Sequence, residues 1–251
     1  MLSIRIVGLG LFLSIVSGKN VKIPKGLPTC YRNDPNLNQC MVEATDKIRP
    51  MLRAGIPELK IPSLEPFNLP QVDLQQGSQA LNFRATLNDV VIHGLTNYKF
   101  SRFDFDVKNL QFFCEAHLDS IQLNGNYNVT GRILIAPIVG NGKFVAKIDS
   151  ADAVVYQKYE IGDIKGNKHI IPVFTNSSIN VSGPKAVLDG LFDGNKELND
   201  ITNKAISDNV DELFEDLKPV VEETITRIME DLLLKHLTAN IPYDQLYPVK
   251  P

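Results

Sequence analysis

A stretch of roughly one hundred residues with a period of two most constrains how this chain can fold. Phe103, Phe105 and Val107 alternate with charged residues, and the segments 127–133 and 144–148 repeat that alternation. No helical pattern interrupts residues 80–182, so the sequence predicts an antiparallel sheet of long, strongly coiled strands. The expected hairpin turns are Asn124-Gly125, Asn141-Gly142 and Gly166-Asn167.

Residues 197–237 change to a helical period, with a cap expected at Asn195 and an end at Asn240 and Pro242. One helix of this length would measure ~60 Å, whereas a compact globule of this size has a diameter of only ~45 Å. The helix is too long for a sphere unless Pro219 bends it, which favours an elongated molecule with a sheet wrapped along a helical spine. The predicted fold class is therefore α+β, with a long C-terminal α-helix wrapped by a highly curved antiparallel β-sheet.

The first eighteen residues have the order of a secretory signal peptide. Arg5 precedes an apolar run over residues 6–16, and small residues follow up to Gly18. The apolar run spans only ~16 Å as a helix, about half of the ~30 Å hydrocarbon core of a bilayer. We expect a signal peptide at 1–18, secretion, an extracellular location, no transmembrane segment, and one domain over 19–251.

Secretion permits a disulfide, and Cys30 and Cys40 lie ten positions apart. Asp34-Pro35 is a candidate start for a helix that places Cys40 in an early turn. Cys114 remains, and its apolar neighbours favour a buried, inert thiol. Three sequons, at Asn128, Asn176 and Asn180, are candidate N-glycosylation sites in the same compartment.

Between the cysteines and the predicted sheet, apolar residues recur at helical spacing from Leu37 to Leu52. Pro50 predicts a kink or a new helix there, and Gly55 predicts the end. Prolines at 57, 62, 66 and 70 then require an extended or turning segment that cannot be the centre of a sheet.

The chain lacks the common catalytic and metal-binding motifs. It contains no G-x-S-x-G and no H-E-x-x-H, and its four histidines have no metal-ligand spacing. The net charge of −3 gives no basic footprint for nucleic acid. We expect no enzyme, no cofactor, no metal and no nucleic-acid partner, although distant residues that converge in a cryptic hydrolase remain an alternative.

The apolar face of the sheet and the apolar stripe of the helix can enclose either a solid core or a cavity for a small molecule. Periodicity is compatible with both. For a cavity, Tyr127 is a candidate polar contact, and the expected lining residues are Phe103, Phe105, Tyr127, Val129, Ile133, Phe144, Leu213, Phe214 and Leu217.

Several segments carry a family resemblance. The cysteine pair is followed by the proline-rich motif over residues 48–66, and further matches lie at 125–134, 140–142, 190–198 and 241–246. Together they resemble the insect takeout and haemolymph juvenile-hormone-binding protein (JHBP) family. The resemblance implies a TULIP-like fold with a hydrophobic tunnel, which carries juvenile hormone, other terpenoids or fatty acids outside cells.

The resemblance also implies a disulfide between Cys30 and Cys40. Hormone carriers of the family have a second disulfide that the lone Cys114 cannot supply, which favours the takeout-like, circadian clock-controlled branch. The expected protein is a monomeric carrier of a hydrophobic small molecule, linked to circadian, feeding or chemosensory regulation, with a receptor of unknown identity. The alternative is an extracellular protein-interaction or membrane-surface module with a filled tunnel.

Overall fold

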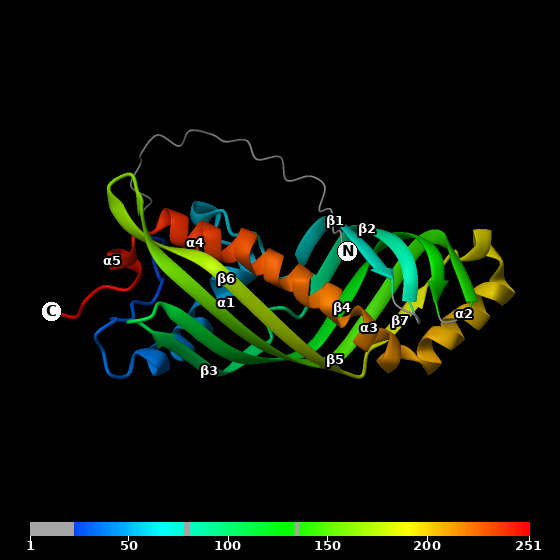
Figure 1. Ribbon diagram of the computed structural model, residues 1–251, viewed down its shortest axis with the longest axis horizontal. Coiled ribbons are helices and arrows are strands. Elements are labelled where there is room, and N and C mark those ends of the chain that lie inside the picture. Colours follow the sequence, from blue (N-terminus) through cyan, green and yellow to red (C-terminus); the bar gives the residue numbers. More distant parts are fainter. Residues whose placement is uncertain (1–22, 78–80, 134–135) are drawn as a thin grey trace.

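The computed structural model describes residues 23–77, 81–133 and 136–251, and the predicted signal peptide lies outside these ranges. The molecule is elongated, and a strongly curved sheet runs along its length beside a long helical segment (Figure 1). Within the described ranges the strands form one seven-stranded antiparallel sheet. The predicted α+β class is confirmed.

The sheet has the order β1-β2-β4-β5-β6, with β3 paired to β4 and β7 paired to β5. Its two central strands, β4 and β5, are 23 and 29 residues long, and they pair along the whole length of β4. The strand bounds are β1 Phe67–Gly77, β2 Leu81–His93, β3 Tyr98–Asp106, β4 Gln111–Ile133, β5 Ala136–Ile164, β6 Asn167–Ser182 and β7 Lys185–Leu188. Pro70 lies in β1, which is an edge strand, as a proline in a sheet requires.

Two of the three predicted turns are wrong. Asn124-Gly125 lies inside β4 and Asn141-Gly142 lies inside β5, whereas Gly166 does form the turn between β5 and β6. At Gly142 a side chain would collide with the backbone oxygen of Asp189, in the segment that leads from β7 to α2. Glycine is needed there for a close crossing of two backbone segments, not for a reversal of the chain.

Along β4, the residues that face inward change from even-numbered to odd-numbered positions at Ser120, which has a φ of 52°. Before this residue the inward positions are even, as at Leu118, and after it they are odd, as at Ile121. The side chains of Leu118 and Ile121 pack in the same cluster, together with residues of α3. The left-handed residue therefore keeps apolar side chains on the concave face along the whole strand.

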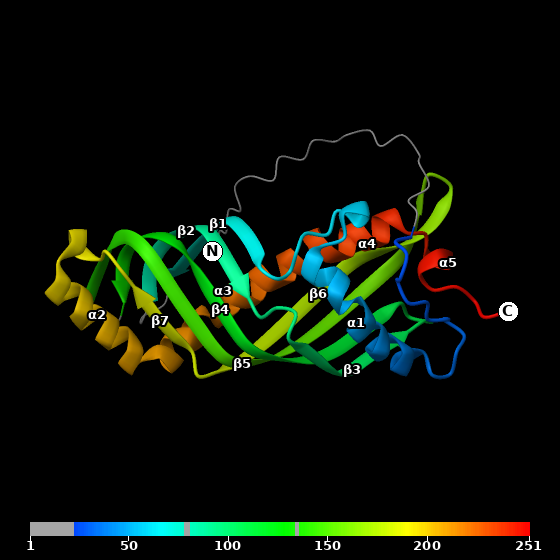
Figure 2. The ribbon, with the colours of Figure 1, turned by 180° about the vertical axis from the view of Figure 1, so that it is seen from behind.

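The C-terminal helical segment is not one helix. Its bounds are α2 Lys196–Asp208, α3 Val210–Ile228, a π-helical segment η3 Met229–Leu234, α4 Lys235–Asn240 and α5 Tyr243–Leu246. Asn195 caps the start as predicted, with its side chain accepting a hydrogen bond from the backbone N–H of Leu198 at 3.1 Å. The interruption comes at Asn209, whereas α3 continues through Pro219, a solvent-exposed position. Figure 2 shows α3 and α4 along the sheet, with α2 at the far end.

The N-terminal helix, α1 Leu37–Ala54, packs against β3 and continues through Pro50 without a break. It begins two residues after Pro35, because the Asp34 side chain accepts a hydrogen bond from the backbone N–H of Asn36 at 2.8 Å and holds a turn there. Gly55, with a φ of 84°, ends it as predicted. A 3₁₀ turn, η1 Pro57–Leu59, follows, and a second, η2 Phe192–Gly194, precedes α2.

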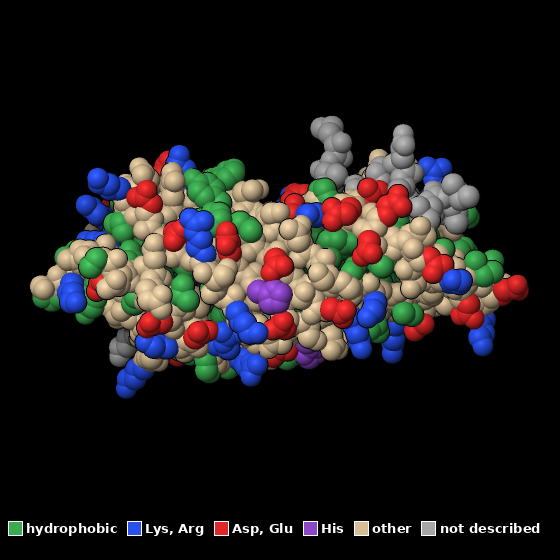
Figure 3. Space-filling view, turned by 90° about the horizontal axis from the view of Figure 1, so that it is seen from below, with side chains coloured by type: hydrophobic (Ala, Val, Ile, Leu, Met, Phe, Trp, Pro, Cys, Tyr) green, Lys and Arg blue, Asp and Glu red, His purple; other side chains and the backbone are tan. Residues whose placement is uncertain are grey.

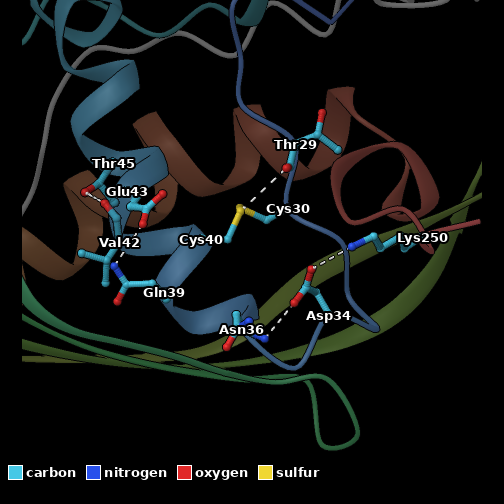
Figure 4. Close-up of a disulfide and its surroundings, with 10 residues drawn as sticks. All are labelled: Thr29, Cys30, Asp34, Asn36, Gln39, Cys40, Val42, Glu43, Thr45 and Lys250. Atoms are coloured by element: carbon cyan, nitrogen blue, oxygen red, sulfur yellow. Dashed lines mark hydrogen bonds and ion pairs between the residues drawn. A yellow bond between two sulfur atoms is a disulfide. The ribbon is translucent and has the colours of Figure 1, made fainter.

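The predicted disulfide between Cys30 and Cys40 is confirmed, with a Cα–Cα distance of 5.8 Å. It joins the extended segment before α1 to the first turn of that helix (Figure 4). An ion pair between Asp34 and Lys250 lies beside it, at 3.7 Å between Oδ2 and Nζ. The two ends of the described chain are therefore held together at one end of the molecule.

Three apolar clusters follow one another along the concave side. The α1-end cluster is built on Cys30, Leu37, Met41, Phe105, Phe112, Tyr159, Ile170 and Tyr243. The middle cluster is built on Ile121, Ala151 and Ile179, against which Phe214, Val221 and Ile225 pack. The β2-end cluster is built on Ala85, Val90, Tyr127, Val129, Ile138, Phe144 and Leu191.

Candidate ligand-binding interior

The space between α3 and the centre of the sheet is floored by small side chains. Cys114 and Ala116 on β4 lie opposite Val155 and Ala153 on β5, on the face that α3 covers. Cys114, Ala116 and Ala153 are only half-buried, although they lie on the inward face of central strands. A floor packed to native density would bury them more completely, so their accessibility indicates room beneath the helix for an apolar molecule.

The helical segment that covers this floor also indicates room in the interior. Val221 and Ile225 pack toward the middle cluster, yet both remain half-buried, as does every residue from 221 to 230. In a solid core, the inward stripe of a helix is much less accessible than its outer side. Over residues 221–230 the two sides of the helical segment differ little in accessibility, whereas Leu213 and Val220 earlier in α3 are buried.

The structure spreads the predicted lining residues along the molecule instead of gathering them in one pocket. Phe103 and Phe105 belong to the α1-end cluster, where the ring of Phe105 stacks on that of Phe112 at 4.0 Å. Phe214 packs against the middle cluster. The Ile133 side chain lies outside the described part of the chain.

The remaining predicted residues lie toward the β2 end. Tyr127, Val129 and Phe144 share the β2-end cluster. Leu213 and Leu217 pack with Ile206 of α2. Both groups border the same elongated interior from opposite sides, the sheet and the helix.

Tyr127 is not free to serve a ligand as a donor. Its hydroxyl donates a hydrogen bond to the backbone oxygen of Asp189 at 2.8 Å. Burial, and to a lesser degree the Asp189 carboxylate, raises the pKa of Tyr127 to about 12, so the hydroxyl keeps its proton at neutral pH. This side chain fastens the loop after β7 to the sheet.

Sequence reasoning missed two inward polar residues, Gln157 on β5 and Thr175 on β6. Gln157 is 7% exposed, and its Oε1 accepts a hydrogen bond from the hydroxyl of Tyr159 at 2.9 Å. Gln157 Nε2 and Thr175 Oγ1 are buried and have no hydrogen-bond partner in the part of the chain that the structure describes. Counting by two from Ala151 places residue 157 on the inward face, but this alternation alone does not mark it as a binding residue.

Cys114 carries a free thiol on the inward face. Burial raises its pKa to about 12, so the thiol is protonated and a poor nucleophile at neutral pH. The structure agrees with an inert thiol.

The described residues offer little for metal or catalytic chemistry. They include no group of three or more His, Cys, Asp or Glu side chains placed to hold a metal ion. Nor does any helix among them have the length and apolar character needed to cross a bilayer.

The three sequons lie on the outer face of the sheet. Asn128, Asn176 and Asn180 are all exposed. The Oδ1 of Asn180 accepts a hydrogen bond from Lys218 Nζ at 2.6 Å. Glycosylation at these positions stays a prediction.

The curved antiparallel sheet and the long helix enclose an elongated apolar interior. This arrangement is typical of a protein that binds an elongated hydrophobic molecule. The chain belongs to the family described as haemolymph juvenile hormone binding protein (JHBP), which matches residues 8–248. The description of this family is that of a binding protein. The predicted family is thus confirmed.

Individual relatives agree with this assignment. The chain is 25% identical to the circadian clock-controlled protein daywake of Drosophila melanogaster, over 96% of this chain and 94% of that protein. The daywake protein of Drosophila yakuba is also 25% identical, over 89% and 88%. The crystal structure of Takeout 1 from Epiphyas postvittana superposes with a TM-score of 0.74 at 26% identity, covering 88% of this chain and all of that one.

Proposed function

We propose that this protein is a secreted carrier that holds one elongated hydrophobic molecule between α3 and the concave face of β4, β5 and β6. The observation that carries the proposal is the half-buried floor of Cys114, Ala116 and Ala153 beneath the helix. Membership of the JHBP family supports the same reading.

Burial alone would supply much of the affinity. A 15-carbon terpenoid hides about 300 Å² of apolar surface, and at ~25 cal/mol per Å² this gives a gross gain of ~7–8 kcal/mol before the cost of association. Micromolar affinity is then within reach without specialised contacts. Juvenile hormone, other terpenoids and fatty acids are the ligand classes we propose.

Secretion is supported by several features together. The disulfide at Cys30–Cys40 suits an oxidising compartment, and the outer face presents all three sequons to solvent. We propose glycosylation there, a monomeric state, and a regulatory role related to the clock-controlled relatives named above.

The second candidate function is an extracellular protein-interaction or membrane-surface module. It is favoured by apolar side chains that are exposed on β5 and β6, namely Ile161, Ile171, Val173 and Phe174. On the face shown in Figure 3, however, charges of both signs are interspersed with polar groups, and apolar side chains occur only in small groups. The room beneath the helix favours the carrier.

Native mass spectrometry of protein secreted from insect cells tests the proposal. We expect a stoichiometric apolar molecule that is released by organic extraction, and binding of a fluorescent fatty-acid probe to the extracted protein. An empty protein that also ignores the probe would refute the carrier and leave the interaction module.

A further inference from the structure

We propose that Gln157 and Thr175 form a polar anchor for an uncharged oxygen at one end of the bound molecule. This inference rests on the proposed carrier function and deepens it, because it names the chemical class of the ligand. Among the proposed ligand classes, the anchor favours a neutral ester, ketone, aldehyde or alcohol with a long apolar body over the anion of a free fatty acid.

The register of the sheet places the two side chains together. Gln157 lies directly opposite Thr175 on β6, and Phe112 of β4 lies on its other side. Directly opposed residues of an antiparallel pair have Cβ atoms ~5 Å apart on the same face. One ligand oxygen can therefore reach both groups.

In the structure the Gln157 amide turns its oxygen toward Tyr159, whose hydroxyl donates to Oε1. Burial raises the pKa of Tyr159 above its usual value, so this hydroxyl keeps its proton at neutral pH. Both N–H groups of Nε2 consequently remain available for a ligand.

Other inward polar groups nearby are paired. The hydroxyl of Ser177, next to Thr175 on the same face of β6, contacts the backbone oxygen of Glu222 at 3.0 Å and Thr226 Oγ1 at 2.6 Å. Buried polar groups in native proteins almost always have a partner. Gln157 Nε2 and Thr175 Oγ1 lack one in the described ranges, which indicates that their partner is a molecule outside the chain.

The two anchoring side chains are themselves uncharged. A carboxylate bound to them would be buried without a counterion from either group, which is unfavourable. An uncharged carbonyl or hydroxyl oxygen carries no such penalty.

The surroundings also give the ligand a direction. On one side of the anchor, Phe105, Phe112 and Tyr159 of the α1-end cluster close the interior. On the other side, the small residues Cys114, Ala116 and Ala153 lead toward the middle cluster. The oxygen-bearing end therefore lies near α1, and the apolar body runs beneath α3.

Competitive displacement of a fluorescent probe from delipidated protein tests the anchor, with methyl hexadecanoate, hexadecanoate and octadecane as competitors at pH 8. We expect the ester to bind about tenfold more tightly than the alkane, the effect of one or two hydrogen bonds to otherwise unpaired groups, and more tightly than the anion. Gln157→Met removes the donors at similar volume. It should reduce the ester preference to within twofold while alkane affinity changes less than twofold.

Two further variants make the test specific. Thr175→Val should weaken ester binding about threefold. This variant tests the anchor independently if Gln157→Met fails to fold. Gln122→Met, at an exposed position of β4, is the matched control and should keep the wild-type preference. Equal wild-type affinity for ester and alkane, or a preference that survives Gln157→Met, would overturn the anchor and leave the carrier intact. A delipidated protein that binds neither the probe nor any of the three competitors would overturn both proposals.

Discussion

Ser177 on β6 and Thr226 on α3 hold their hydroxyl oxygens 2.6 Å apart, which joins the edge of the sheet to the long helix. Close by, Glu222 Oε1 accepts a hydrogen bond from the backbone N–H of Ile179 at 2.9 Å. The height of the helix above the sheet is thus set partly by hydrogen bonds at one edge. Because side-chain packing does not set this height alone, the centre of the interior can remain incompletely filled.

Glu222→Ala should lower the free energy of unfolding by about 1–2 kcal/mol, because the edge N–H of Ile179 loses its acceptor. Urea unfolding followed by circular dichroism measures this change. Glu215→Ala, on an exposed position of the same helix, is the control and should stay within about 0.5 kcal/mol of wild type. Equal effects of the two substitutions would show that the Glu222 contact does not stabilise the fold.

The sequence predicted the architecture well because two periodicities dominate it. A period of two over residues 80–182 indicated the sheet, and the stripe over residues 197–237 indicated the helical segment. The turns at Gly125 and Gly142 were wrong because a local Asn-Gly signal does not reveal a backbone segment that crosses from far along the chain. Pro219 does not interrupt α3, and the molecule is elongated (Figure 1), which is the alternative that the sequence favoured.

The interior was harder to predict than the fold. Around Gln157, polar and aromatic residues occur on both faces of β5, so alternation alone does not single out one inward amide. Its role depends on the hydrogen bond from Tyr159 and on the missing partner of Nε2. The change of face at Ser120 likewise depends on one backbone angle, which no side-chain pattern encodes.

The disulfide should stabilise the folded chain against the unfolded one. It closes a short loop between positions 30 and 40, for which chain entropy gives about 2–3 kcal/mol. The double variant Cys30→Ser/Cys40→Ser should therefore unfold at a lower temperature than wild type in calorimetry. Cys114→Ser keeps the bond and should remain sensitive to reductant, whereas the double variant should not; a double variant as stable as the oxidised wild type would contradict this expectation.

Cys114 should resist alkylation in the native state. With its pKa raised to about 12, very little thiolate exists at pH 8, so iodoacetamide should label it only after unfolding. Above the unfolded-state pKa of roughly 9, the unfolded chain releases this proton first, so stability should fall as pH rises toward 12. Cys114→Ala should show a shallower decline, and rapid labelling of the native protein at pH 8 would refute the buried, protonated thiol.

A large side chain on the floor of the interior should reduce ligand affinity without reducing the stability of the fold. Ala153 lies beneath α3, and Ala153→Phe places an aromatic ring in the space that we assign to the ligand. We expect affinity for a fluorescent fatty-acid probe to fall at least tenfold, while the melting temperature of the ligand-free protein stays within a few degrees, because the ring occupies space that is already open. Val154→Phe puts the same ring on the outer face one residue away and should bind the probe like wild type. If Ala153→Phe instead unfolds the protein and Ala153→Leu is also strongly destabilised, the floor is fully packed and the interior holds no ligand.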